Sequence, residues 1–190
     1  LIEQGLTAER ALERLMESDR GRDLRQIAIV DRDGHTAAYT GAGCIPWAGQ
    51  VEGGAYVCLG NILVGEEVIK AMARAFETSG DQELPERLLL GLEAGQEAGG
   101  DRRGRQSAGI QVVAAEEYPY CDLRVDDHPD PVAELRRVFQ VFQREELPFL
   151  ALMPRRDDPV PQWDAVLRLR DAMETSLEQE EAGLPARRQE

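Results

Sequence analysis

The stretch "RQIAIVDRDGHTAAYTG", residues 25–41, decides the fold class. Apolar and small residues dominate two runs, Gln26–Asp31 and His35–Thr40, which flank the dipeptide Asp33-Gly34. Such a dipeptide tolerates the positive φ angles of a tight turn, so the two runs are predicted to form an antiparallel hairpin. A hairpin of this kind does not suit a doubly wound parallel sheet, in which single strands alternate with helices.

The segments around this hairpin predict an α+β chain. A helix with Thr7 as its N-cap, through about Asp19, precedes the hairpin, and the strand "AYVCLGN", residues 55–61, follows it. A pair of helices, two further strands and a last core helix complete the order, which favours antiparallel sheets with helices packed outside. Their predicted ranges are Glu66–Ser79, Leu84–Glu97, Ser107–Ala114, Cys121–Val125 and Pro131–Arg144.

The domain organisation is predicted from a change in amino-acid composition near Pro154. Residues 1–150 are predicted to form one domain, which is an ordinary size for a single core. Residues 151–190 are predicted to be a proline-punctuated linker and a charged helical arm, with the helix over Trp163–Ala182.

The composition limits the possible partners. The 190 residues carry a formal net charge of −14, so a nucleic-acid surface, which needs clustered basic residues, is not expected. No run approaches the roughly 18 apolar residues of a membrane span, so no membrane segment is expected either. Cys44, Cys58 and Cys121 are widely spaced, which excludes a disulfide framework and familiar zinc spacings and predicts free thiols in the cytoplasm.

The loop in "GGDRRGRQSAGIQVV", residues 99–113, has two interpretations. It is either a solvated connection between a helix and a strand, or a loop that binds an anion through its arginine side chains and turned backbone. Gln106 and Ser107 favour binding slightly, because both can contact a ligand where the loop enters the sheet. The motif is neither a P-loop nor a dinucleotide fingerprint, and no cofactor is predicted.

The segment "DLRVDDHPDP", residues 122–131, contains carboxylates and an imidazole, which are metal-ligand types. Neighbouring residues of a strand point to opposite faces, so three convergent ligands from one stretch are rare, and no metal site is predicted. Capping of the next helix by Asp127 or Asp130, and ion pairing with Arg124 or Arg136, explain the segment more simply, and a buried functional role is the remaining alternative.

Two further blocks, "TGAGCIPWAG" at residues 40–49 and "GNILVG" at residues 60–65, are strand ends with small residues, where a backbone can approach a ligand. Asn61 is either a turn residue or a donor to an oxyanion. Cys44 as a nucleophile would need a base, and His35 and His128 are the only histidines.

Together with "EAGQEAGGDRRGRQSAGIQVV" and "DLRVDDHPDPVAELRRVF", these two blocks resemble the family DUF1028, assigned to the N-terminal-nucleophile (Ntn) hydrolase-like superfamily, over roughly Leu1–Phe142. The resemblance implies a four-layer αββα sandwich whose first strands precede Leu1, and hydrolysis of an amide bond in a small, anionic compound. In Ntn hydrolases the nucleophile is an N-terminal Thr, Ser or Cys, and its α-amino group is the base. Leu1 has no nucleophilic side chain, so the resemblance implies a nucleophile upstream of it.

The resemblance also implies roles for residues of this chain. Asn61 is expected to stabilise the oxyanion, and one of the loop arginines is expected to pair with a substrate carboxylate. A non-catalytic ligand-binding module and a structural subunit on the same scaffold remain alternatives, and a homodimer is expected. The expected ligand-surrounding residues are Thr40, Cys44, Asp101, Arg102, Arg103, Arg105, Gln106 and Ser107.

Overall fold

The computed structural model describes residues 1–160 and 162–183, without the side chains of residues 173 and 176–183. It confirms a mixed α+β chain, in which the described strands form three two-stranded antiparallel sheets. The chain divides into two compact units. Unit 1 comprises Leu1–Ile110 and Arg124–Glu134, and unit 2 comprises Gln111–Leu123 and Leu135–Glu190. The domain boundary predicted after residue 150 stays a prediction.

Unit 1 begins with helix α1, Ala8–Ser18, and the predicted hairpin. Thr7 caps the helix, because its hydroxyl accepts a hydrogen bond from the backbone N–H of Arg10 (3.4 Å). Strands β1, Gln26–Val30, and β2, Thr36–Thr40, pair in antiparallel register, with Ala28 opposite Ala38. The hairpin confirms the interpretation of residues 25–41.

A second hairpin contains a strand that the sequence pattern did not predict. Strand β3, Gly49–Gly53, pairs with the predicted strand β4, Tyr56–Gly60. The β3 sequence "GQVEG" begins and ends with glycine and has a single β-branched residue, so its local strand preference is weak. Pairing with the strongly apolar β4 therefore stabilises β3, whose own sequence has only a weak strand preference.

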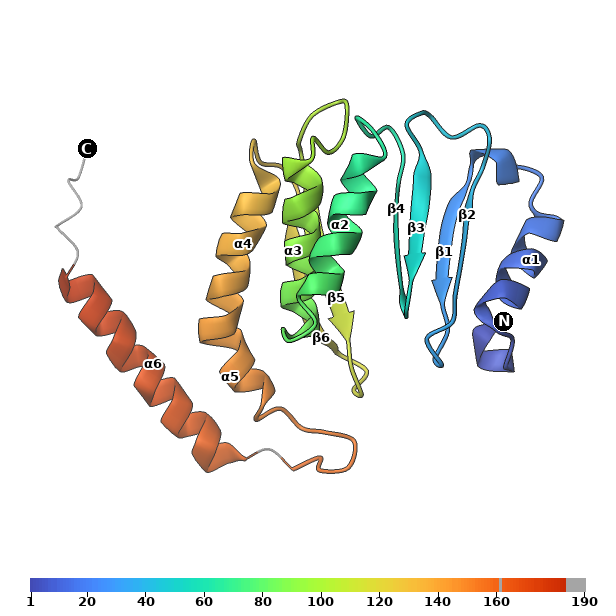
Figure 1. Cartoon of the computed structure of the whole chain (residues 1–190). Coiled ribbons are helices and arrows are strands. Elements are labelled where there is room, and N and C mark those ends of the chain that lie inside the picture. The colour runs from blue at the N-terminus through green and yellow to red at the C-terminus, as the bar shows by residue number, and fades with distance from the viewer. Residues whose placement is uncertain (161, 184–190) are drawn as a thin grey trace. The chain divides into compact units, whose positions relative to one another are not determined.

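Helices α2, Glu67–Thr78, and α3, Leu84–Glu97, follow as a packed pair. Gly95 of α3 faces Met72 of α2, and a Cβ atom at this glycine would lie 2.8 Å from the Met72 Cγ. In Figure 1, α1 lies beside the β1–β2 hairpin, and the β3–β4 hairpin lies between that hairpin and α2. Contacts between these successive elements join them into one body.

The remaining elements are two strands and three helices. The helix predicted over Pro131–Arg144 is α-helical only to Val141, continues as a π-helical turn, and is followed by a short helix that the sequence did not predict. The arm helix begins at Trp163 as predicted, and residues 184–190 of the arm lie outside the described residues. The ranges are β5 Ala108–Val113, β6 Pro119–Val125, α4 Pro131–Val141, α5 Leu147–Leu150 and α6 Trp163–Gly183.

Each unit has its own buried apolar residues. In unit 1 the largest of them are Ile69 and Leu89, one from each helix of the α2–α3 pair. In unit 2, Phe139 and Phe142 stack with ring centroids 6.2 Å apart, and Tyr120 meets Phe142 edge-on at 6.5 Å. These three rings form an aromatic cluster within unit 2.

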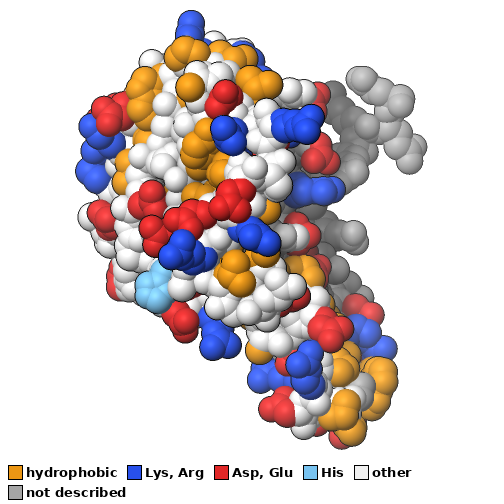
Figure 2. Space-filling model, turned by 90° about the vertical axis from the view of Figure 1, so that its right-hand side faces the viewer, with side chains coloured by type: hydrophobic (Ala, Val, Ile, Leu, Met, Phe, Trp, Pro, Cys, Tyr) orange, Lys and Arg blue, Asp and Glu red, His pale blue; other side chains and the backbone are white. Residues whose placement is uncertain are grey.

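The surface carries charges of both signs. On the face shown in Figure 2, basic side chains are interspersed with acidic ones and with hydrophobic side chains, and form no continuous basic area. Among the described residues, no helix is long and apolar enough to cross a membrane.

Candidate functional site

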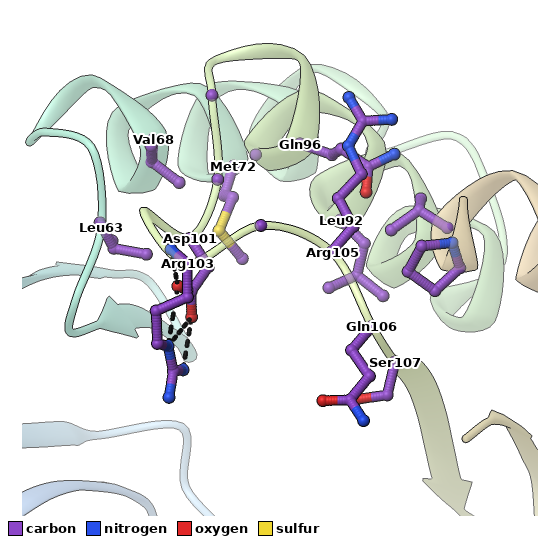
Figure 3. Close-up of a pocket in the computed structure, with 16 residues that line it drawn as sticks. Leu63, Val68, Met72, Leu92, Gln96, Asp101, Arg103, Arg105, Gln106 and Ser107 are labelled. Carbon is purple, nitrogen blue, oxygen red and sulfur yellow. Dashed lines mark hydrogen bonds and ion pairs between the residues drawn. The ribbon is translucent and has the colours of Figure 1, made fainter. Parts of the chain in front are cut away.

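A cavity of about 630 Å³ opens beside the loop Gly99–Ser107 in unit 1 (Figure 3). Its lining combines an apolar part and a polar part, which is typical of a small-molecule site. The apolar side chains come from helices α2, α3 and α4 and from the segment before α2, and are Leu63, Val68, Met72, Leu92, Pro131 and Val132. The polar side chains come from the end of α3 and from the loop, and are Gln96, Asp101, Arg103, Arg105, Gln106 and Ser107.

The loop has a defined backbone conformation. Gly99, Gly100 and Gly104 have positive φ angles of 112°, 59° and 111°, which side chains rarely allow. The N–H of Arg102 donates to the carbonyl of Ile62 (2.8 Å), and the N–H of Val64 donates to the carbonyl of Gly100 (3.0 Å). The start of the loop is therefore fixed to the chain between β4 and α2.

Backbone hydrogen bonds bring the four sequence blocks together. The N–H of Leu63 donates to the carbonyl of Trp47 (3.1 Å), and the N–H of Ile62 donates to the carbonyl of Ile45 (3.0 Å). On the other side of the loop, the N–H of His128 donates to the carbonyl of Gln106 (2.9 Å). Segments that lie far apart in the sequence thus surround one loop.

Arg103 is bound to Asp101 within the loop. Its Nε and Nη2 atoms lie 3.0 and 2.6 Å from the two carboxylate oxygens, and its backbone N–H donates to Oδ1 (2.7 Å). The side-chain hydrogen bonds from Arg103 hold the pKa of Asp101 below its ordinary value, so the carboxylate stays ionised. This pair forms one side of the cavity, and Gln106 and Ser107 lie on the other side (Figure 3).

Arg105 is held more loosely than Arg103. Its Nη1 atom lies 3.4 Å from Oδ1 of Asp130, and the same oxygen accepts a 2.9 Å hydrogen bond from Nε2 of Gln96. The backbone N–H of Asp130 donates to Nδ1 of His128 (3.0 Å). The Asp130 carboxylate thus binds Gln96 and Arg105, and the Asp130 carbonyl accepts the N–H of Glu134 at the start of α4 (3.1 Å). Capping of this helix by the Asp127 or Asp130 side chain stays a prediction.

Arg102 lies outside the cavity lining. Its Nη1 atom donates to the carbonyl of Pro46 (3.0 Å), which fixes the loop to the "TGAGCIPWAG" block. Of the three loop arginines, the structure therefore brings Arg103 and Arg105 to the cavity. At residues 122–131, Arg124 pairs with Asp126 at 3.9 Å, as the sequence predicted.

Thr40 and Asn61 belong to a second polar cluster, which is centred on Gln26. The Nε2 atom of Gln26 lies 3.1 Å from the Thr40 hydroxyl, 3.1 Å from the Gly49 carbonyl and 2.8 Å from the Gly60 carbonyl. Its Oε1 accepts a 3.1 Å hydrogen bond from the side-chain amide of Asn61. Gln26 thereby links β1 to both strands of the second hairpin.

Sequence reasoning missed Gln26 and Gln50 as members of this cluster. The Thr40 hydroxyl donates to Oε1 of Gln50 (2.6 Å), and Nε2 of Gln50 donates to the Ala38 carbonyl (3.0 Å). Gln26 is the one polar residue of strand β1, and such a residue on a strand that faces another sheet is the signal that could have revealed it. Gln50 shares its strand face with Glu52, so no local pattern distinguishes it.

Cys44 is not brought to a histidine. Its Sγ lies 3.4 Å from the Arg25 carbonyl, whereas Nδ1 of His35 contacts Asp31 and Nδ1 of His128 accepts from Asp130. No hydrogen bond within the described part of the chain joins Cys44 to either ring. All three cysteines are free, and burial raises the pKa of Cys58 and raises that of Cys121 to about 11, so these two thiols are poor nucleophiles.

One cluster has metal-ligand residue types, namely Asp31, Asp33 and His35, whose ligand atoms lie within 4.8 Å of one another. The Asp31 carboxylate already accepts hydrogen bonds from the backbone N–H groups of Ala8, Asp33 and His35 at 2.9–3.1 Å. This carboxylate therefore holds the β1–β2 turn against the start of α1, which accounts for the cluster without an ion.

Comparison with known proteins places the chain in a family. The sequence profile of the family of unknown function DUF1028 matches residues 1–135. The crystal structure of protein SPO2555 from Silicibacter pomeroyi, which carries the same family designation, superposes with a TM-score of 0.73 at 30% sequence identity. The match covers 83% of this chain and 70% of that chain. No curated protein matches the sequence. The chain therefore belongs to DUF1028, a family of unknown function.

Proposed function

We propose that this chain forms the ligand-binding part of an Ntn-type amidohydrolase, which cleaves a small, anionic amide compound with a nucleophile from a segment upstream of Leu1. One observation carries the proposal. The loop Gly99–Ser107, to which the other three sequence blocks are hydrogen-bonded, lines a cavity of small-molecule size that contains two arginines and an apolar wall. A cavity with these properties suits a ligand with an anionic group and an apolar body.

The arrangement of unit 1 supports the four-layer αββα sandwich that belongs to this proposal. Helix α1 contacts the β1–β2 hairpin, this hairpin contacts β3–β4, and α2 contacts the second hairpin (Figure 1). Ntn hydrolases place their reacting residue between two such sheets, and the Gln26 cluster lies between the two hairpins.

The proposed chemistry is acyl transfer to an N-terminal Thr, Ser or Cys. The side-chain oxygen or sulfur attacks the amide carbonyl, and its proton passes through the α-amino group to the leaving amine. Water then attacks the resulting ester or thioester, releases the acid and restores the nucleophile. In this proposal the side-chain amide of Asn61 stabilises the oxyanion of both tetrahedral intermediates. Thr40 and Cys44 flank the nucleophile, and the polar loop residues bind the anionic end of the substrate.

Ligand binding without turnover is the second candidate function. The only hydroxyl side chain among the described lining residues is that of Ser107, and no histidine, lysine or cysteine lines this cavity. The cavity by itself therefore offers an anion-binding surface and no activated nucleophile. A homodimer in the cytoplasm is part of the proposal for either function.

The test uses the protein expressed from its complete gene. Mass spectrometry of the intact protein is expected to show a mature N-terminal Thr, Ser or Cys, and a panel of N-acyl amino acids is expected to release free amines. Any other N-terminus together with absent turnover would overturn the hydrolase proposal, and retained ligand binding in that protein would support the second candidate.

A further inference from the structure

The three loop arginines differ in how much of their hydrogen-bonding capacity is already used. Arg102 donates to the Pro46 carbonyl and does not line the cavity. Arg103 binds both carboxylate oxygens of Asp101 at 2.6–3.2 Å. Arg105 makes a single contact of 3.4 Å through Nη1 to Asp130 within the described residues. Since a guanidinium has five N–H donors, Arg105 retains more of them for a ligand than Arg103, the other arginine that lines the cavity.

The neighbours of Arg105 hold its anionic partner in place. Asp130 is fixed by a 2.9 Å hydrogen bond from Gln96 and by its own N–H bond to His128. Its position therefore does not depend on Arg105. The arginine is oriented by a preformed carboxylate, while half of its side-chain surface stays exposed at the cavity edge. This arrangement orients the guanidinium before a ligand arrives.

The charge of the lining fits one negative group. The ionised side chains that line the cavity are Asp101, Arg103 and Arg105, and Asp130 pairs with Arg105 from just outside the lining, so these four charges cancel. One ligand carboxylate would be met by the unused N–H donors of Arg105. A dianion would bring a second negative charge close to the Asp101 and Asp130 carboxylates without a further cation to balance it.

The rest of the lining fits an aliphatic body and an amide. Leu63, Val68, Met72 and Leu92 form an apolar wall without aromatic rings, so branched aliphatic groups have complementary neighbours. The side chains of Gln96, Gln106 and Ser107 are neutral groups that donate and accept hydrogen bonds, as an amide requires.

We propose that Arg105 is the specificity-determining residue of this cavity, and that it selects N-acylated aliphatic amino acids through their single carboxylate. The inference rests on the proposed function for the amide, and it adds the charge, the body and the recognising residue of the ligand. Arg105 binds the carboxylate, the apolar wall binds the aliphatic side chain, and the Asp101 and Asp130 carboxylates disfavour dianions.

The first test compares ligands on the full-length protein by isothermal titration calorimetry. N-acetyl-L-leucine is the probe, N-acetyl-L-leucinamide lacks only its charge, and N-acetylglycine lacks its aliphatic side chain. Both of these ligands are expected to bind about ten-fold more weakly than N-acetyl-L-leucine, or weaker still. The leucinamide lacks the charge-assisted hydrogen bond to the carboxylate, and N-acetylglycine lacks the apolar area that the leucine side chain buries. Inorganic phosphate is expected to compete poorly.

The second test compares two variants of the same loop. Arg105→Gln is expected to abolish the preference for N-acetyl-L-leucine over its amide, whereas Arg102→Gln is expected to keep it. The inference would be overturned if both variants lost the preference for the acid equally. It would also be overturned if the wild type bound the acid and the amide equally, or bound neither. Hydrolysis of N-acetyl-L-leucine with unchanged efficiency in Arg105→Gln would overturn it while leaving the proposed hydrolase in place.

Discussion

The Oδ2 atom of Asp31 accepts a 3.1 Å hydrogen bond from the backbone N–H of Ala8, a residue 23 positions earlier in the chain. The first N–H groups of a helix have no partner within the helix, and here the turn after β1 supplies one. Oδ1 of the same carboxylate accepts the N–H groups of Asp33 and His35 at 3.0 and 2.9 Å. One buried carboxylate therefore joins the first helix to the first hairpin.

Replacement of Asp31 by asparagine should destabilise unit 1. The variant keeps the shape of the side chain, but one acceptor oxygen becomes an NH₂ donor that faces N–H groups, so buried donors lose their partner. The melting temperature, followed by circular dichroism, is expected to fall by several degrees. Asp33→Asn is the matched control, because the Asp33 side chain is largely exposed, and it is expected to melt near the wild type. Equal melting of the two variants would contradict the role of Asp31.

The same carboxylate predicts a dependence of stability on pH. Burial acts to raise the pKa of Asp31, but the N–H groups of Ala8, His35 and Asp33 outweigh it and hold the pKa below the ordinary value of 3.8. A lowered pKa means that the stabilisation is complete well above pH 3.8 and is lost as the pH falls through the native pKa. The difference in melting temperature between wild type and Asp31→Asn should therefore shrink in this acidic range. A difference that stays constant down to pH 2 would exclude this linkage.

The elements with strong local patterns were predictable from the sequence. The predicted range of α3 agrees with the structure at both ends, because Pro85 marks its first turn and its leucines recur with helical spacing. The first hairpin agrees to within a residue of its predicted strands for the same kind of reason. Strand β3 and helix α5 were not predictable, since their stability depends on pairing and packing with residues elsewhere in the chain.

Gln26 is predicted to stabilise the contact between the two hairpins. In Gln26→Glu the side chain no longer donates, so the carbonyls of Gly49 and Gly60 lose their partner and face a carboxylate. The free energy of unfolding in urea is expected to fall by about 2 kcal/mol. Gln4→Glu, at an exposed position, makes the same chemical change and is expected to leave the unfolding curve unchanged. A similar loss in both variants would assign the effect to net charge.

The candidate site was only partly predictable. The polar loop Gly99–Ser107 is visible in the sequence, because glycines and arginines concentrate there. Which arginine faces the cavity depends on side-chain partners from distant segments, namely Pro46 for Arg102 and Asp130 for Arg105. The apolar wall is drawn from several elements, so no local pattern could reveal it.

The size of the cavity should depend on Gly95. In Gly95→Ala the new Cβ lies 2.8 Å from Cγ and 3.0 Å from Sδ of Met72, so the flexible methionine must move, and its side chain lines the cavity. Alanine favours the helix by about 1 kcal/mol, which offsets the cost of moving Met72. The melting temperature is therefore expected to change little, while binding of N-acetyl-L-leucine weakens several-fold.

Gly91→Ala is the matched control for Gly95→Ala. It lies in the same helix, and its new Cβ meets only the Met72 carbonyl at an ordinary 3.7 Å. Helix propensity rises in both variants, but only Gly95→Ala displaces the Met72 side chain. Equal affinities of the two variants for N-acetyl-L-leucine, measured by calorimetry, would show that Met72 does not shape the binding cavity.

Asn61 separates the catalytic proposal from a purely structural role. If its amide stabilises the oxyanion, Asn61→Ala in the full-length protein should lower kcat about 100-fold with little change in KM, because the interaction exists only in the transition state. Asn61 also donates to Oε1 of Gln26 at 3.1 Å, so a structural role predicts a lower melting temperature like that of Gln26→Glu. Steady-state kinetics and thermal melts on one preparation distinguish the two. A loss of stability with kcat retained in the folded fraction would leave Asn61 as a turn residue that positions Gln26.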